Sequence, residues 1–196
     1  MPKIKFRDIF VPTAALVIIC GISTALLAGT NELTKEPIAE AERSGLQMSM
    51  EAVSMDNADR FERLDIDDNT AECYKVLDKD DNIISYAVTT SAKGYGGTIK
   101  VMTGIDISGN IIGVNVYDNS DETPGLGAKT SHESFCGQFT GRSADKAFAV
   151  TKDSQKFPDN QTVDAVTGAT ISSRSVVSAV DHALEIYKLA VGGEGQ

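Results

Sequence analysis

A short segment rich in hydroxyl side chains, residues 164–173, has the clearest chemical potential in this sequence. It reads Asp-Ala-Val-Thr-Gly-Ala-Thr-Ile-Ser-Ser and immediately precedes the last predicted helix. The free N–H groups and the dipole of a helix N-terminus favour a phosphate group, and a hydroxyl held there could become covalently attached to it. The simpler interpretation is a helix cap, in which Ser and Thr side chains satisfy the first N–H groups of the helix.

Two further segments are rich in glycine, so that a ligand could approach their backbone closely. Residues 122–127 read Glu-Thr-Pro-Gly-Leu-Gly and lie in a long loop predicted after a strand. Proline fixes one dihedral angle and glycine permits close backbone approach. The segment is therefore either a surface turn or part of a binding site, since long loops in compact domains are often functional. Residues 94–97, Gly-Tyr-Gly-Gly, place flexible backbone beside an aromatic ring.

The order and spacing of these three segments, behind an apolar N-terminal stretch, resemble one protein family. The chain is similar to the G subunit of the Rnf ion-translocating oxidoreductase, a relative of the C subunit of the sodium-pumping NADH:quinone reductase. Residues 164–170, Asp-x-x-Thr-Gly-Ala-Thr, match the flavinylation motif of that family. The resemblance covers most of the chain and is weakest over residues 32–90. The chain looks short for the quinone-reductase protein, which favours the Rnf protein.

The resemblance implies a covalently bound FMN. A phosphodiester bond would join the flavin phosphate to the hydroxyl of Thr170, installed by a separate FAD-dependent, magnesium-requiring FMN transferase. The other motif residues would present Thr170 to that enzyme: Asp164, Thr167, Gly168 and Ala169. The remaining candidate cofactor-binding residues would lie around the flavin: Glu122, Thr123, Pro124, Gly125, Leu126, Gly127, Tyr95, Gly96, Lys129 and Ser172.

The resemblance also implies an electron-transfer role without independent substrate turnover. FMN links one-electron and two-electron carriers, and the protein holds the ring and sets its potential. The complex would move electrons between ferredoxin and NAD and couple this to Na⁺ or H⁺ transport. The partners would be other membrane subunits, especially the flavin-carrying D subunit and the A and E subunits. Two alternatives stay open: a stand-alone flavinylated electron carrier, and an anchored binding module without a cofactor, in which Thr170 is only a helix cap.

The elements around these segments predict an α+β domain over residues 71–196, with a mostly antiparallel sheet and packed helices. Apolar alternation and turn signals predict strands at residues 72–78, 83–89, 98–107, 111–117 and 146–151. Residues 108–110, Ser-Gly-Asn, predict a hairpin turn. A long loop is expected over residues 118–130, a short helix over 131–139 and a final helix over 171–190, with an apolar face at helical spacing.

The N-terminal part predicts a membrane anchor. Residues 9–28 carry no charge, and at about 1.5 Å per residue they would span roughly 30 Å, one hydrocarbon core. A cleaved signal peptide is the alternative, although the apolar run is longer than a usual signal core. Residues 1–8 hold three basic side chains and one acidic one. The positive-inside rule then predicts a cytoplasmic tip at 1–8, a transmembrane helix at 9–29, a helical stalk at 30–70 and an extracytoplasmic FMN-binding domain at 71–196.

Composition excludes several classes of function. With 18 basic and 28 acidic side chains the net charge is −10, which repels phosphate backbones, so we expect no nucleic-acid binding. Three scattered cysteines and two histidines show no metal-ligand spacing, so we expect no metal site. Two Asp-x-Asp-x-Asn segments, at residues 65–69 and 78–82, lack the glycine and glutamate of a calcium loop and are interpreted as turns.

Overall fold

The structure is a computed structural model that describes residues 6–66, 68–151 and 161–193. The chain divides into two compact units, Met1–Ser44 and Gly45–Gln196.

Helix α1, Phe6–Ala52, makes up the described part of the first unit and continues into the second. It contains a segment that is long and apolar enough to cross a membrane. Its large apolar side chains are not covered by protein: Ile18, Leu26 and Leu27 are 60%, 67% and 72% exposed. An uncovered apolar helix of this length fits a hydrocarbon environment. The predicted long apolar helix is therefore confirmed, whereas residues 1–5 of the basic tip lie outside the described residues.

The helix expected over residues 30–70 ends at Ala52, and strand β1, Arg60–Leu64, lies in the second part of that range. The five residues of β1 read Arg-Phe-Glu-Arg-Leu and pair antiparallel with the next strand. Its two apolar residues, Phe61 and Leu64, are three positions apart, which fits a helical period as well as an edge strand. The local sequence pattern does not distinguish a helix from an edge strand here. Pairing with β2 makes the segment a strand.

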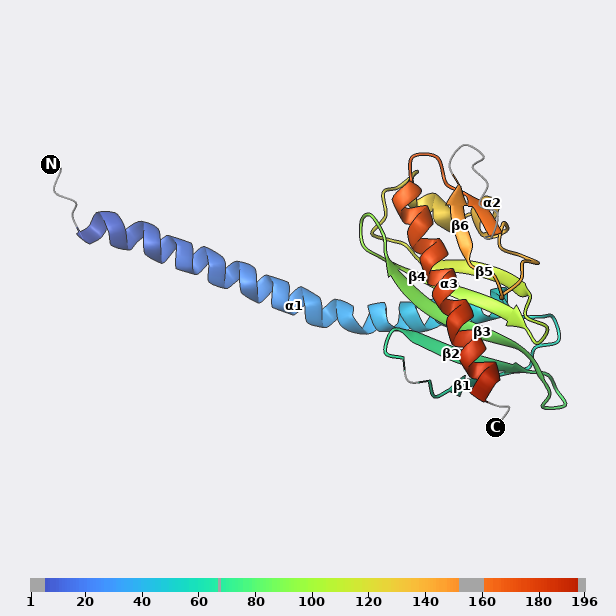
Figure 1. Cartoon of the computed structure of the whole chain (residues 1–196). Helices are drawn as coiled ribbons and strands as arrows, with labels where there is room; N and C mark the ends of the chain where they lie inside the picture. The colour runs from blue at the N-terminus through green and yellow to red at the C-terminus, as the bar shows by residue number, and fades with distance from the viewer. Residues whose placement is uncertain (1–5, 67, 152–160, 194–196) are drawn as a thin grey trace. The chain divides into compact units, whose positions relative to one another are not determined.

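An antiparallel sheet of five strands in chain order, β1-β2-β3-β4-β5, forms the body of the second unit (Figure 1). The four other strands are β2, Ala71–Leu77; β3, Ile83–Lys93; β4, Thr98–Asp106; and β5, Ile111–Asp118. The predicted strands and the mostly antiparallel α+β class are thus confirmed. A separate parallel pair joins β6, Phe148–Thr151, to β7, Gln161–Asp164. Strand β7 was not predicted, because only Val163 of its four residues is buried.

Helix α3, Thr170–Gly193, covers one face of the sheet and packs mainly on β3 and β4 (Figure 1). Two side chains fasten it to β3. Thr90 Oγ1 donates a hydrogen bond to the carbonyl of Ala179 at 2.8 Å. Near the start of the helix, Ser175 Oγ donates to the carbonyl of Lys93 at 2.6 Å. Because Lys93 is the last residue of β3, the N-terminal part of α3 lies beside the end of β3, where the loop to β4 begins.

The opposite face of the sheet is covered by the end of α1 and the residues that follow it. Met50 and Val53 pack there against three buried sheet residues, Val76, Ala87 and Met102. The sheet is thin at this contact because Gly104 of β4 pairs with Gly113 of β5. A Cβ atom on Gly104 would overlap the carbonyl oxygen of Val53. The residue that follows α1, Val53, therefore packs directly against the sheet backbone at Gly104, with no side chain between them.

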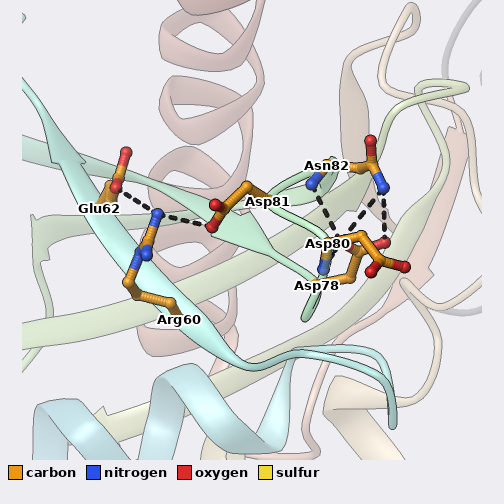
Figure 2. Close-up of polar contacts among 6 residues, drawn as sticks. All are labelled: Arg60, Glu62, Asp78, Asp80, Asp81 and Asn82. Carbon is orange, nitrogen blue, oxygen red and sulfur yellow. Dashed lines mark hydrogen bonds and ion pairs between the residues drawn. The ribbon is translucent and has the colours of Figure 1, made fainter.

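The turn between β2 and β3 confirms that residues 78–82 are a turn (Figure 2). Asp78 Oδ1 accepts hydrogen bonds from the backbone N–H groups of Asp80 at 2.8 Å and Asn82 at 2.9 Å. The bonds from Asn82 hold the pKa of the Asp78 carboxyl below its usual range. Figure 2 also shows Arg60 of β1 paired with Glu62 and with Asp81. Across the described residues, no group of three or more His, Cys, Asp or Glu side chains could hold a metal ion.

Candidate functional site

An open cavity of about 570 Å³ lies where two loops meet the first turn of α3. Its volume falls in the range of small-molecule and cofactor sites, about 300–1,000 Å³. One loop connects β3 to β4, and the other follows β5. Its lining residues are Tyr95, Glu122, Thr123, Leu126, Gly127, Gly168, Ala169, Thr170, Ile171 and Ser172. The structure thus brings together the three segments that sequence analysis singled out.

The loop after β5 is compact and internally hydrogen-bonded. Asn119 Nδ2 donates to the carbonyl of Ala128 at 3.0 Å and so joins the two ends of the loop. The 3-10 helix η1, Gly127–Ser131, and the short helix α2, Glu133–Cys136, follow directly. These two short elements replace the single helix predicted over residues 131–139. Thr130 Oγ1 donates to the carbonyl of Gly127 at 2.7 Å, which fixes the backbone where it lines the cavity.

Glu122 contributes a buried acidic side chain to the lining of the cavity. The residue is 3% exposed. Its Oε1 accepts a hydrogen bond from the backbone N–H of Gly96 at 3.0 Å, and its Oε2 accepts one from Ser172 Oγ at 2.6 Å. Burial raises the pKa of this carboxyl, but the Ser172 hydroxyl and the N–H groups of Gly96, Tyr95 and Gly97 outweigh burial and hold the pKa below its usual range. Glu122 is therefore ionised at neutral pH.

Two glycines make room for this carboxylate. A Cβ atom on Gly127 would overlap Glu122 Oε2 and lie 2.8 Å from Ser172 Oγ. A Cβ atom on Gly94 would overlap Glu122 Oε1. Since real Cβ atoms do not approach other atoms so closely, a side chain at either position would displace the carboxylate. The glycines of both predicted segments thus serve the packing around Glu122.

Thr170 is the first residue of α3, and its half-buried side chain lines the cavity. The turn before it is held by Ser173, which is fully buried. Ser173 Oγ accepts a hydrogen bond from the N–H of Val166 at 3.0 Å and donates one to the carbonyl of Ala169 at 2.9 Å. Sequence reasoning missed this role. Serine is common in the first turn of a helix. Only the structure shows that this hydroxyl bonds to the backbone of the preceding turn, at Val166 and Ala169.

Six other predicted residues are not among those that line the cavity. They are Gly96, Pro124, Gly125, Lys129, Asp164 and Thr167. Asp164 ends β7, where its Oδ1 accepts a hydrogen bond from Thr151 Oγ1 at 2.6 Å and its backbone N–H donates to Gln138 Oε1 at 2.8 Å. Ile171, which was not predicted, does line the cavity and is 55% exposed. It escaped notice because an apolar residue in the first turn of a helix usually packs inward.

Comparisons with known proteins agree with the resemblance seen in the sequence. Residues 94–185 match the FMN-binding domain family, and residues 5–53 match the RnfG N-terminal region. The chain is 33% identical over 188 residues to the G subunit of the proton-translocating ferredoxin:NAD(+) oxidoreductase complex of Clostridium ljungdahlii, covering 96% of both chains. It is 40% identical over 107 residues to the G subunit of the Na(+)-translocating complex of Acetobacterium woodii, covering 54% of this chain and 50% of that one.

Two solved structures have a similar fold. One is the C subunit of the Na(+)-translocating NADH-quinone reductase of Parabacteroides distasonis, with a TM-score of 0.51 and 26% identity over 59% of this chain and 61% of that chain. The other is NqrC of Shewanella oneidensis, with a TM-score of 0.51 and 25% identity over 69% of this chain and 67% of that chain. Because the match to the Clostridium protein spans nearly the whole of both chains, the chain belongs to the family of G subunits of Rnf-type ion-translocating oxidoreductase complexes, with an FMN-binding domain over residues 94–185.

Proposed function

We propose that this chain carries FMN through a phosphodiester bond to the hydroxyl of Thr170. In this role it passes electrons within an Rnf-type ferredoxin:NAD oxidoreductase that is coupled to Na⁺ or H⁺ translocation. One observation carries the proposal: Thr170 opens helix α3 and lines a cavity of about 570 Å³ in the domain that matches the FMN-binding family.

The residues around the cavity suit both halves of FMN. The first N–H groups of a helix have no partner within it, and the helix dipole favours an anion there, so the start of α3 suits the phosphate. Tyr95, Leu126 and Ile171 offer apolar surface for a flat ring, and all three side chains line the cavity. When bound, FMN supplies one-electron and two-electron chemistry, while the protein positions it and sets its potential.

The attachment step transfers an FMN phosphoryl group without redox change. An FMN transferase takes the group from FAD. A bond forms between Thr170 Oγ and the phosphorus on the flavin side, the pyrophosphate bond breaks, AMP leaves, and the hydroxyl proton passes to solvent. The remaining motif residues act by shaping the turn that exposes Thr170: Gly168 has φ +79°, a left-handed conformation that favours glycine.

The membrane anchor determines on which side of the membrane the FMN-binding domain lies. Helix α1 contains a segment that is long and apolar enough to cross a membrane. With the basic tip in the cytoplasm, residues 71–196 lie on the extracytoplasmic side, where a covalent bond prevents loss of the flavin. The partners are the other membrane subunits of the complex, the flavin-carrying D subunit and the A and E subunits above all. Co-purification with polytopic subunits separates this role from that of a stand-alone electron carrier.

Intact-protein mass spectrometry and in-gel flavin fluorescence test the attachment. The full chain is co-expressed with an FMN transferase and compared with Thr170→Ala and with Thr140→Ala, a control at an exposed threonine after α2. We expect the wild type and Thr140→Ala to gain the mass of FMN less one water, and Thr170→Ala to gain none. An unmodified wild type, with the transferase shown to be active on another substrate, refutes the proposal and leaves Thr170 as a helix cap.

A further inference from the structure

We propose that Glu122 is a positioning residue for FMN attachment: its carboxylate fastens the β3–β4 loop to the first turn of α3 and so holds Thr170 in place at the cavity. The inference rests on the proposed function above, because it concerns the same threonine.

The carboxylate connects three segments that are far apart in the sequence. Glu122 itself belongs to the loop after β5. Its Oε1 accepts from Gly96, which lies 26 residues earlier, and its Oε2 accepts from Ser172, which lies 50 residues later. Ser172 is two residues beyond Thr170 in the first turn of α3. The loop and the acceptor turn therefore share one anchoring group.

The surroundings of Glu122 are built for an ionised carboxylate. A buried charge is costly unless hydrogen bonds satisfy it, and hydrogen bonds to an ionised acceptor are stronger than neutral ones. The donors that the structure gives this carboxylate are neutral: the hydroxyl of Ser172 and backbone N–H groups of residues 95–97. The two side-chain oxygens therefore tie the backbone of the β3–β4 loop to the Ser172 hydroxyl of α3 through neutral donors.

Both carboxylate oxygens are engaged by the protein itself, although Glu122 lines the cavity. Its influence on Thr170 therefore passes through Ser172 and the helix turn. The short hydrogen bond of 2.6 Å to Ser172 fixes one rotamer in the turn that presents Thr170. Loss of the whole carboxylate frees both the loop that carries Tyr95 and the first turn of α3, whereas loss of the Ser172 bond alone frees only the helix turn.

One substitution at Glu122 should keep the bridge, meaning the pair of hydrogen bonds to Gly96 and Ser172, and another should remove it. In Glu122→Gln the carbonyl oxygen still accepts from Gly96, and the amide nitrogen donates to Ser172 Oγ, since a hydroxyl also accepts. In Glu122→Ala both connections are lost. Ser172→Ala removes one connection only. Glu133→Ala, at an exposed glutamate of α2, controls for loss of a negative charge from the same domain.

The test measures the rate of FMN attachment to the purified full chain by an FMN transferase supplied with FAD and Mg²⁺, followed by intact mass. We expect Glu122→Ala to lower kcat at least tenfold with little change in KM for the chain. Glu122→Gln should stay within about threefold of the wild type, as should Glu133→Ala. Ser172→Ala should fall between them, and the double variant Glu122→Ala/Ser172→Ala should be no slower than Glu122→Ala.

Amide hydrogen exchange gives a second readout that does not depend on flavin. Exchange at residues 95–97 and in the first turn of α3 should speed up at least tenfold in Glu122→Ala and remain slow in Glu122→Gln. If Glu122→Ala does not fold, Ser172→Ala decides: wild-type attachment and exchange in that variant overturn the inference. Wild-type attachment in a folded Glu122→Ala also overturns it. A wild-type chain that accepts no FMN overturns the proposed function instead, and the exchange measurement still shows whether the bridge holds the loop.

Discussion

Replacing Gly104 with alanine tests how the sheet holds the end of α1. Gly104 lies in β4, and the carbonyl group of Val53 rests directly on it. A Cβ atom added at this position would overlap the Val53 carbonyl oxygen and lie 2.9 Å from both the carbonyl carbon and the Cβ atom of Val53. These are mostly backbone atoms in a residue that is 1% exposed, so no side-chain rotation relieves the contact. The end of α1 must move away from the sheet.

The cost follows from the size of the overlap. Inserting a methyl group into a well-packed core costs about 1–3 kcal/mol. For a domain of this size, each kcal/mol lowers Tm by about 2–4 °C. Gly104→Ala should therefore lower Tm by about 2–12 °C. Gly113, the partner of Gly104 across β4 and β5, supplies a matched control. A Cβ atom there would meet its nearest neighbour, Val53 Cα, at 3.8 Å, an ordinary contact.

Near-UV circular dichroism of the detergent-solubilised full chain, followed on heating, measures the effect. Gly113→Ala should keep the wild-type Tm or gain slightly, because alanine loses less backbone entropy than glycine in a strand. Gly104→Ala with a wild-type Tm would refute the reasoning, since it would mean that the end of α1 does not rest on β4. Equal losses in both variants would also refute it, because they would trace the effect to the strand pair alone.

Three further predictions concern α3 and its neighbours. Ser173→Ala leaves the N–H of Val166 without its acceptor and should lower the free energy of unfolding by about 1–2 kcal/mol in urea titrations. Burial raises the pKa of Asp181 to about 6, although the N–H of Phe148 donates to it. The folded state thus binds the proton of the Asp181 carboxyl more tightly than the unfolded chain does. The stability that the protonated carboxyl contributes is fully present below about pH 4 and is lost as the pH rises through 6. Asp181→Asn should therefore have the wild-type free energy of unfolding at pH 4 and a free energy about 1 kcal/mol higher than the wild type at pH 8. This gain is smaller than the full pKa shift implies, because solvent screens a half-buried group. Burial also raises the pKa of the Cys136 thiol to about 11, so iodoacetamide at pH 8 should alkylate it at least tenfold more slowly in the folded chain than in urea, as read by peptide mass.

The sequence was most informative where short segments carry special residue types. The segments 94–97, 122–127 and 164–173 were predicted to form one site, and residues from each of the three line one cavity. The family resemblance supplied that expectation, because no local rule brings together segments that begin up to 70 residues apart, at 94 and 164. The strands from 71 to 118 were predictable because each is rich in apolar and β-branched residues and joins its neighbour through a short turn.

Elements and contacts that depend on distant partners were not predictable. Strand β7 becomes a strand only by pairing in parallel with β6, and its four residues contain one core side chain, Val163. Strand β1 is also short, with five residues, and lies at the sheet edge. The bond between Glu122 and Ser172 joins two ordinary polar residues, and nothing in either local sequence indicates the other. A buried charge of this kind is recognised only when its donors are placed in space.

The exposure of the cavity explains why a covalent bond suits this site. Tyr95, Leu126 and Ile171 line it, yet they are 71%, 43% and 55% exposed. Sites for drug-sized ligands usually bury about 70–90% of the ligand surface, and a cavity that is open to solvent on one side covers less of its ligand than an enclosed one. Under the proposed function, the bond at Thr170 supplies the retention that burial does not, and the open face is left for an electron-transfer partner. A Thr170→Ala chain that kept FMN through gel filtration would contradict this argument, because it would show that the cavity alone retains the cofactor.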